Sequence, residues 1–295
     1  MNAPNSTVPS AAAASPLKRP GDSSIGGLLL ATGKITPEAA ERVLRMQKEM
    51  GLRFGEAAQR LGLITEDDIK QVLARQFDYP YLQPGQGNYS ERLKAAYQPF
   101  SHQVEKLRAV RSQLMLRWFA RGHKSLAIVA VNPDDGASLL AANLAVVFSQ
   151  LGEHTLLVDA NLRAPSQHEI FGLQARQGLS DVLAGRADID AATKIEHFVD
   201  LSVLGAGTLP PNPQELLSRN GFGNINLALE SRFDVVLYDL APFALGSDAL
   251  AVAARVGGVL LVARQNQTLM ADISSMAEQI VQCGAEVVGS ILVDS

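Results

Sequence analysis

The sequence predicts a mixed α/β protein in which a mainly parallel, doubly wound sheet is preceded by a small all-α repeat domain. Two observations carry this prediction. After residue 124, short apolar runs alternate with helical segments, which is the pattern of strands buried between two layers of helices. Before residue 77, two segments match each other at a constant offset of 29 residues, which indicates a duplicated structural unit.

The composition agrees with this organisation. A chain of 295 residues is long enough for about two domains. The formal net charge of −4 argues against nucleic acid as a partner, because neutralising phosphates needs clustered lysine and arginine. The single cysteine, Cys283, excludes a disulfide framework and a zinc–thiolate cluster. No apolar stretch reaches the ~20 residues of a membrane span, so we expect a cytoplasmic location.

The first 23 residues are rich in alanine, serine and proline. They lack the basic start, apolar centre and cleavage site that mark a secretory signal. A segment of this composition buries too little apolar surface to offset its chain entropy. We therefore expect residues 1–23 to form a disordered tail.

The repeat occupies residues 24–76 and consists of two units, 24–47 and 53–76. Each unit predicts a short helix, a glycine stop and a second helix. The second helix follows a threonine, Thr36 or Thr65, that serves as its N-cap. Acidic residues in the first turn after each threonine interact favourably with the helix dipole. These features predict a small bundle made of two related helical pairs.

Each unit also resembles the motif of N-terminal domains found in type II secretion and pilus ATPases. Some members of that family bind cyclic di-GMP through paired motifs, in which glycines let the backbone approach the ligand. The first copy departs from the motif, with Ser24 in place of arginine and Lys34 at an aliphatic position. A compact helical adaptor without a ligand therefore remains the alternative. The cyclic di-GMP site implied by the resemblance consists of Gly26, Arg53, Gly55 and Gly62.

Residues 77–103 contain prolines and glycines that break any long helix, so we expect a linker with partial order. Four of the five tyrosines lie in this segment, namely Tyr79, Tyr81, Tyr89 and Tyr97. The first interpretation is that they anchor the linker to the domain surfaces. The alternative is that one of them is a phosphorylation site.

The large domain is expected to span residues 104–295 and to begin with a helix. Its apolar residues lie on one stripe, while Glu105, Arg108 and Arg111 stand at three-residue steps and so share one face. Taken alone, these three charges predict a solvated face with internal ion pairs. Such pairs contribute only a few tenths of a kcal/mol each.

Strands are expected at the apolar runs that follow, and polar residues stand where several of these runs end. The first run is followed by the loop Asn132–Gly136, while Asp159 and Asp239 lie near the ends of two later runs. Ligands of parallel sheets bind at the carboxyl ends of the strands. The sequence therefore predicts a site at this edge.

The segments NPDDGASLLAANLA, LLVDANLRAP, VVLYDLAP, GLSDVLAG and LPPNPQELL together resemble the bacterial tyrosine kinases of capsule and exopolysaccharide synthesis. This family is a branch of the MinD/ParA-type P-loop ATPases. The resemblance is strongest to the chain-length-determinant tyrosine kinases of exopolysaccharide loci, and it covers about residues 24–295. It implies a P-loop-type sheet and Mg-ATP as the cofactor.

The resemblance also assigns roles to individual residues. Ser138 would bind Mg²⁺, Asp159 would activate the attacking hydroxyl or hold the metal, and Asp239 would complete the metal shell. Glu105, Arg108 and Arg111 would form the subunit interface of a kinase ring, which implies a homo-oligomer. The implied nucleotide-binding positions are Pro133, Asp134, Asp135, Gly136, Ala137, Ser138, Leu139, Asn161, Arg163 and Val293.

Several of these positions depart from the family pattern. A phosphate loop needs glycines and a basic residue, but Asp134 takes a glycine position and Ala137 takes the position of the basic residue. Asn161 replaces the second acidic residue, and Val293 stands where an asparagine reads adenine. The usual C-terminal tyrosine cluster is missing, and Tyr238 is expected inside a core strand. We therefore expect binding of Mg-ATP to be weak or absent.

Three functions follow as hypotheses. The leading one is a non-catalytic member of this kinase family that scaffolds or regulates a polysaccharide polymerisation and export complex. Its partners would be a membrane-embedded chain-length determinant (a polysaccharide co-polymerase) or sister kinase subunits, and these would hold it at the inner membrane. The second is an active ATP-dependent tyrosine autokinase that controls chain length. The third is an adaptor that responds to cyclic di-GMP.

Overall fold

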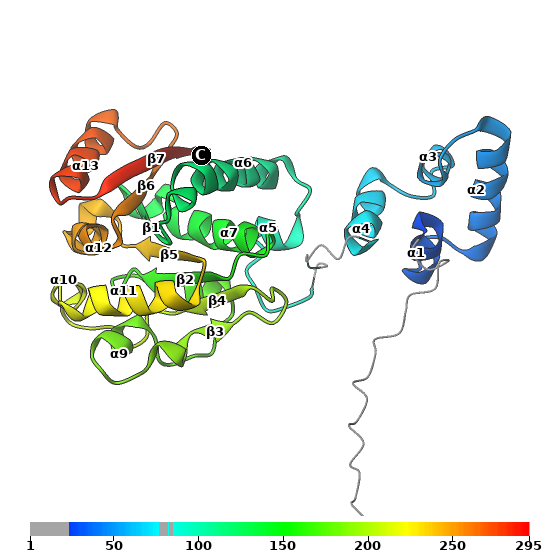
Figure 1. Cartoon of the computed structure of the whole chain (residues 1–295). Coiled ribbons are helices and arrows are strands. Elements are labelled where there is room, and N and C mark those ends of the chain that lie inside the picture. Colours follow the sequence, from blue (N-terminus) through cyan, green and yellow to red (C-terminus); the bar gives the residue numbers. More distant parts are fainter. Residues whose placement is uncertain (1–23, 77–81, 83–84, 295) are drawn as a thin grey trace, which may run out of the picture. The chain divides into compact units, whose positions relative to one another are not determined.

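The computed structural model describes residues 24–76, 82 and 85–294. The chain divides into two compact units, Met1–Tyr79 and Pro80–Ser295 (Figure 1). The expected tail, residues 1–23, lies outside the described residues, and so do Tyr79 and Tyr81. Within the described residues, no helix combines the length and the apolar character needed to cross a membrane.

Residues 24–76 of the first unit form four helices, as the two repeat units predict. Ser24 accepts a hydrogen bond from the amide of Gly27, and Thr36 accepts one from the amide of Ala39, so both side chains cap the helices that follow. Leu29, from the first repeat unit, lies in a common apolar core with residues of the second unit. The helices are α1 (Ile25–Ala31), α2 (Pro37–Met50), α3 (Phe54–Arg60) and α4 (Glu66–Gln76).

Three glycines of the implied cyclic di-GMP site have structural reasons to be glycine. A Cβ on Gly26 would lie 3.2 Å from the ring of Phe54, and one on Gly55 would lie 3.1 Å from Ile69. Gly62 has a φ of +66° and ends the first helix of its repeat unit in the left-handed region. Packing and turn geometry therefore account for these glycines without a ligand, and cyclic di-GMP binding stays a prediction.

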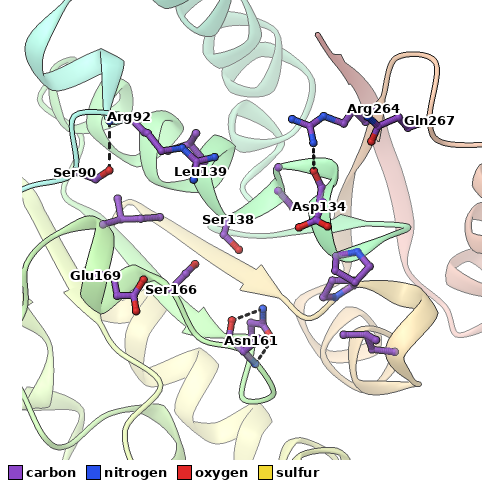
Figure 2. A pocket seen from close by; sticks show the side chains of 17 residues that line it. Ser90, Arg92, Asp134, Ser138, Leu139, Asn161, Ser166, Glu169, Arg264 and Gln267 are labelled. Atoms are coloured by element: carbon purple, nitrogen blue, oxygen red, sulfur yellow. Dashed lines mark hydrogen bonds between the residues drawn. The ribbon is translucent and has the colours of Figure 1, made fainter. Parts of the chain in front are cut away.

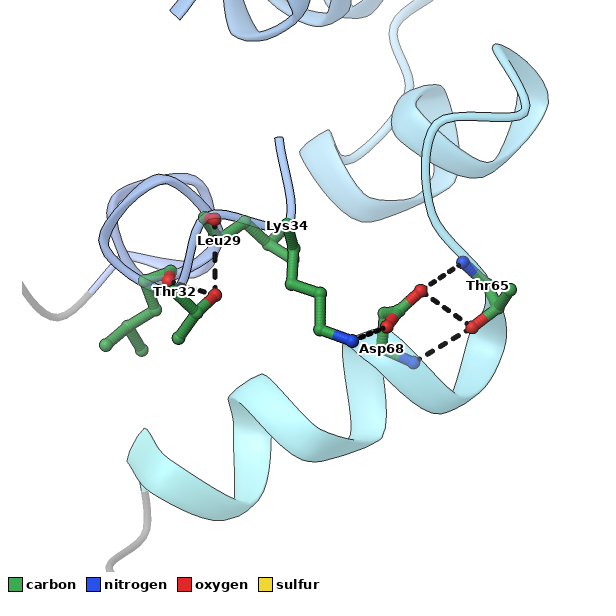
Figure 3. Close-up of polar contacts among 6 residues, drawn as sticks. Leu29, Thr32, Lys34, Thr65 and Asp68 are labelled. Atoms are coloured by element: carbon green, nitrogen blue, oxygen red, sulfur yellow. Dashed lines mark hydrogen bonds and ion pairs between the residues drawn. The ribbon is translucent and has the colours of Figure 1, made fainter. Parts of the chain in front are cut away.

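Lys34, which departs from the repeat motif, joins the two repeat units (Figure 3). Its Nζ lies 2.6 Å from Asp68 Oδ1, in the first turn of α4. The other carboxylate oxygen, Asp68 Oδ2, accepts hydrogen bonds from the amide and the hydroxyl of Thr65. The hydrogen bond from Lys34, followed by the one from the Thr65 amide, lowers the pKa of Asp68 to about 2. A lysine is therefore compatible with this position because the second repeat unit supplies its counter-charge.

Replacing Lys34 by methionine is expected to destabilise the helical unit by about 1 kcal/mol near pH 7, because an exposed lysine that pairs with a partly buried carboxylate contributes at the upper end of the usual range. The depressed pKa means that this stability is present above the ordinary Asp pKa and is lost as the pH falls through about 2. Amide hydrogen exchange around Leu29 in the whole chain would report the loss. Lys70→Met, at an exposed pair with Glu66, is the control. Equal exchange in both variants would contradict the prediction.

The second unit is built on a seven-stranded sheet in the order β3-β4-β2-β5-β1-β6-β7. Neighbouring strands are parallel except β3 and β4, so the expected mainly parallel sheet is confirmed. The two-residue strand β3 was not expected, because two residues leave no periodic pattern. The strands are β1 (Ser125–Ala130), β2 (Thr155–Ala160), β3 (Thr193–Lys194), β4 (Leu201–Leu204), β5 (Val235–Leu240), β6 (Gly258–Arg264) and β7 (Glu286–Val293).

Helices cover both faces of this sheet (Figure 1). On β1, Leu126 and Ile128 enter a core with α6 and α7, whereas Ala127 and Val129 enter a second core with α11, α12 and α13. Tyr238 is fully buried in β5, as expected. The helices are α5 (Lys94–Tyr97), α6 (His102–Arg117), α7 (Ala137–Ser149), α8 (Gln167–Ile170), α9 (Leu179–Leu183), α10 (Pro213–Leu217), α11 (Gly221–Arg232), α12 (Asp248–Val256) and α13 (Met270–Gln282).

Part of the expected linker packs on the α/β unit. Leu93, Ala95 and Ala96 are buried in the core beside α7, and the amide of Ala95 donates to Asn143 Oδ1 at 2.8 Å. The Tyr89 hydroxyl lies 3.0 Å from His197 Nδ1. The residues around α5 therefore pack against α7.

Candidate functional site

A pocket of about 740 Å³ lies at the carboxyl edge of the sheet, beside the loop that joins β1 to α7 (Figure 2). The strands β2, β5 and β1 are neighbours in the sheet, so the segments that follow them meet at one place. Seven of the ten implied nucleotide-binding positions line the pocket. They are Pro133, Asp134, Gly136, Ala137, Ser138, Leu139 and Asn161.

The loop between β1 and α7 forms a short 3₁₀ turn over Pro133–Asp135 and then reverses at Gly136, whose φ is +85°. This left-handed conformation explains why a glycine is retained there. Asp134 is exposed and lines the pocket, so its carboxylate adds negative charge where a phosphate would bind. Ala137 opens α7 with a methyl group in place of a cation.

Three implied nucleotide-binding residues do not line the pocket. Asp135 is buried, and its carboxylate accepts a hydrogen bond from the amide of Asn132 at 3.0 Å, which closes the loop. Arg163 makes a two-point ion pair with Asp248, with distances of 2.6 and 2.9 Å. Val293 lies behind Gly136, 4.0 Å from where a Cβ of that glycine would be. Each residue is thus committed to a contact within the fold.

Two arginines in the pocket were not expected from the sequence. Arg264 ends β6, and its Nη1 donates to the carbonyl oxygen of Asp134 at 2.7 Å, while its Nε is buried without a partner. Arg92 lines the pocket from the segment before α5. A charged residue directly after an apolar run could have identified Arg264. No pattern marks Arg92, because its segment has neither helical nor strand periodicity.

The three implied metal ligands lie together beside the pocket. Asp159 and Asp239 are paired in register on the neighbouring strands β2 and β5, and both are fully buried. The Ser138 hydroxyl donates to Asp239 Oδ1 at 3.0 Å. Asp159 Oδ2 accepts hydrogen bonds from the amides of Ser166 and Gln167, at 3.0 and 2.9 Å. The structure thus brings together Asp159 and Asp239, which follow from the strand ends, and Ser138, which the family resemblance implied.

Burial dominates the electrostatics of the carboxyl pair. It raises the pKa of both Asp159 and Asp239, because a charged carboxylate loses its hydration inside the sheet. The neighbouring charge of Asp239 raises the pKa of Asp159 further. Hydrogen bonds from Gln167 and Ser138 to Asp239 oppose the shift. The pair is therefore a site that retains a proton more readily than free carboxylates do.

The side chains beside the pocket include the ligand types of a hard divalent cation, whereas the loop lacks the basic residue of the family pattern. Ser138, Asp159 and Asp239 supply the oxygen ligands that Mg²⁺ prefers, and both carboxylate oxygens of Asp239 accept hydrogen bonds, from Ser138 and Gln167. Asn161, at the second acidic position, bonds both ways with Ala164 in a local turn. The triphosphate of ATP would instead meet a carboxylate and a methyl group at the loop. The implied metal ligands are therefore present, while the loop departs from the family pattern at Asp134 and Ala137.

The three charged residues of α6 make contacts within the unit. Arg108 forms an ion pair with Glu105, and Arg111 Nη1 donates to the carbonyl oxygen of Val147 near the end of α7. Arg111 therefore holds α6 against the last turn of α7, where a cation also suits the helix dipole. A subunit interface formed by these residues stays a prediction.

No protein-family model matches the chain. Among known proteins, the tyrosine-protein kinase YwqD of Bacillus subtilis is 32% identical over 198 residues, which cover 67% of this chain and 84% of that protein. The tyrosine-protein kinase wzc of Salmonella typhimurium is 32% identical over 201 residues, which cover 68% of this chain. The matched region spans only 28% of the length of that relative.

Solved structures give the same result. The kinase domain of the Escherichia coli tyrosine kinase ETK matches with a TM-score of 0.68 and 29% identity, covering 74% of this chain and 86% of that one. The chimerical protein CapA2B2 matches with a TM-score of 0.64 and 33% identity, covering 78% and 98%. The septum site-determining protein MinD of Pyrococcus horikoshii shares the fold, with a TM-score of 0.51 and 22% identity, covering 58% and 70%.

Proposed function

The chain belongs to the chain-length-determinant tyrosine kinases, the bacterial tyrosine kinase family of capsule and exopolysaccharide synthesis, and from this premise we propose that it is a non-catalytic member. Its role would be to scaffold or regulate a polysaccharide polymerisation and export complex. The proposal rests on the altered phosphate loop beside a retained kinase fold. The absence of a cation from the loop and the carboxylate of Asp134 both oppose nucleotide binding.

The expected size of this electrostatic effect supports the proposal. Two unit charges ~4 Å apart interact by about 4 kcal/mol at an effective dielectric of ~20. Asp134 is exposed, so solvent screens its charge. We therefore take about a third of this interaction energy for the repulsion between Asp134 and a phosphate. Because about 1.4 kcal/mol is a tenfold change in affinity, the loss of the cation and the added carboxylate together weaken ATP binding by a hundredfold or more. Cellular ATP, at millimolar levels, would then leave much of the site empty.

The phosphoacceptor side supports the same proposal. Among the described residues, the hydroxyls of Tyr89 and Tyr97 make hydrogen bonds inside the unit, and Tyr238 is fully buried. A tyrosine in such a position must leave its packing before it can reach a phosphate. Tyr79 and Tyr81 lie outside the described residues.

One observation favours the alternative of an active autokinase. Arg92 and Arg264 bring two positive charges into the pocket, and guanidinium groups pair well with phosphate oxygens. On this alternative, Arg264 would take over the work of the missing loop cation, with Asp159 and Asp239 holding Mg²⁺. The alternative therefore requires that phosphotyrosine accumulates when the chain is given ATP.

The partners that we propose follow from the family. They are a membrane-embedded chain-length determinant and sister kinase subunits, with Glu105, Arg108 and Arg111 at a homo-oligomer interface. Binding to the chain-length determinant would place this chain at the cytoplasmic face of the inner membrane. The homo-oligomer can be tested by measuring the molecular mass in solution of the wild-type chain and of a variant in which Glu105 and Arg108 are both replaced by alanine.

We expect calorimetric titration of the whole chain to give a Kd for Mg-ATP weaker than about 1 mM, with Mg-ADP alike. The physical reason is the loop, which offers phosphate a carboxylate and a methyl group. Mass spectrometry after incubation with ATP is the companion measurement, and we expect Tyr79, Tyr81, Tyr89 and Tyr97 to remain unmodified. Micromolar affinity would overturn the proposal, and phosphotyrosine at these positions would establish the autokinase alternative.

A further inference from the structure

Gln167 occupies an unusual place for an uncharged side chain. It is the first residue of α8, it is completely buried, and it lies among the oxygen atoms implied as metal ligands. Its Nε2 donates at 2.7 Å to Asp239 Oδ2 and at 3.0 Å to the carbonyl oxygen of Ser138. The Ser138 hydroxyl donates to Asp239 Oδ1. Both oxygens of Asp239 therefore already accept hydrogen bonds from the chain itself.

The orientation of the amide is fixed by these contacts. If the amide were reversed, Oε1 would face Asp239 Oδ2 and the carbonyl oxygen of Ser138. All three oxygens are hydrogen-bond acceptors, so no hydrogen bond would form between them. In the observed orientation the amide satisfies both neighbours, although Oε1 is left buried without a partner. An unsatisfied buried acceptor costs free energy, so the two donated bonds must outweigh that cost. The partially positive NH₂ group thus takes the position in which a cation would neutralise Asp239.

We propose that Gln167 is a positioning residue that closes the divalent-cation site, by holding Ser138 and Asp239 with its amide where a metal ion would otherwise join them. The inference deepens the proposed function and rests on it in treating the site as non-catalytic. The cation and the amide compete for Asp239 Oδ2, and only one of them is accommodated. The loop residues Asp134 and Ala137 take no part in this competition, so the cation site is closed independently of the changes in the loop.

The test is a Mn²⁺ titration of the whole chain followed by electron paramagnetic resonance, without nucleotide. We expect the wild-type chain to show no bound Mn²⁺ up to about 1 mM, and Gln167→Ala to bind at least tenfold more tightly. Gln167→Met occupies a similar space but donates no hydrogen bond, so it should bind Mn²⁺ more tightly than the wild type and less tightly than Gln167→Ala. Gln282→Ala, on the exposed face of α13, is the control for a lost glutamine elsewhere.

Two further variants make the result decisive. Adding Asp239→Asn to Gln167→Ala should abolish the gained Mn²⁺ binding, which places the ion at Asp239. Mn²⁺ should raise the melting temperature of Gln167→Glu far more than that of the wild type. This measurement tests the inference even if Gln167→Ala does not fold. Tight Mn²⁺ binding by the wild type, or no gain in either variant, would overturn the inference. Because no nucleotide is present, that failure is separate from a failure of the proposed function.

Discussion

Replacing Asp134 by glycine and Ala137 by lysine is expected to raise the affinity of the chain for Mg-ATP at least a hundredfold. The first change removes a carboxylate from the pocket, and the second places an ammonium group at the start of α7, where the backbone amides already favour an anion. Together, these two charge changes should make the binding free energy of Mg-ATP more favourable by several kcal/mol, even after solvent screening. At about 1.4 kcal/mol for each tenfold change, the sum corresponds to a hundredfold or more.

Calorimetry on the whole chain measures this gain directly. Ala137→Met lengthens the side chain without a charge, and Asp134→Asn removes the charge without restoring the glycine, so each should recover less than the double change. The contact between Arg264 and the carbonyl oxygen of residue 134 is a backbone contact, and it survives both substitutions. If the double variant bound Mg-ATP no better than the wild type, the loop would not be the cause of weak binding. Arg264 and Arg92 would then be the residues to examine.

The elements predicted from the sequence are those in which one strong local pattern agrees with the tertiary structure. The apolar runs expected as strands after residue 124 became strands, and all of them except the edge strand β7 are buried, because such a run is stable in a sheet that helices cover. The repeat became four helices, because glycine stops and threonine caps mark their ends. Lys34 could be identified as a departure from the motif, but its partner Asp68 lies 34 residues further along the chain. Pairing at that distance follows from the fold, not from a local pattern.

The site divides in the same way. The neighbouring positions of Asp159 and Asp239 could be expected, because polar residues at the ends of parallel strands meet at one edge. The place of Ser138 followed only from the resemblance to the kinase family, because this residue lies in the first turn of α7 and not at the end of a strand. Gln167 was not predictable, because an uncharged residue in a four-residue helix carries no periodic or motif information. The partner of Arg163 could not be identified from the sequence for a related reason. Its motif position suggested a ligand contact, but the acidic residue that engages it, Asp248, belongs to a helix far along the chain.

Replacing Asp239 by asparagine is expected to stabilise the α/β unit by on the order of 2 kcal/mol at about pH 8, and to leave its stability nearly unchanged at about pH 4. Burial raises the pKa of Asp239 above its unfolded value, and the same is true of Asp159. The folded chain therefore binds more protons than the unfolded chain across the neutral range. Stability from these groups is complete below the unfolded pKa and is lost as the pH rises through the folded pKa.

Asparagine suits the position because its amide can reproduce both hydrogen bonds. Its oxygen accepts from Gln167 Nε2, and its NH₂ group donates to the Ser138 hydroxyl, which turns to accept. The asparagine removes both the buried charge and its repulsion of Asp159. Urea unfolding with EDTA present, followed through the fluorescence of Trp118, measures the free energy of unfolding at each pH.

Asp248→Asn is the matched control, because Asp248 is also buried but is paired with Arg163. Removing this carboxylate leaves a guanidinium without its partner, so the control should lose stability at pH 8 where Asp239→Asn gains it. The two substitutions should change the free energy of unfolding in opposite directions. This difference distinguishes a carboxyl group beside another acid from one that is paired with a cation. A loss of stability in both variants would show that Asp239 is stabilised as a charged group. The cation site would then be one that the fold keeps ready for a metal ion, and the closing role assigned to Gln167 would have to be abandoned.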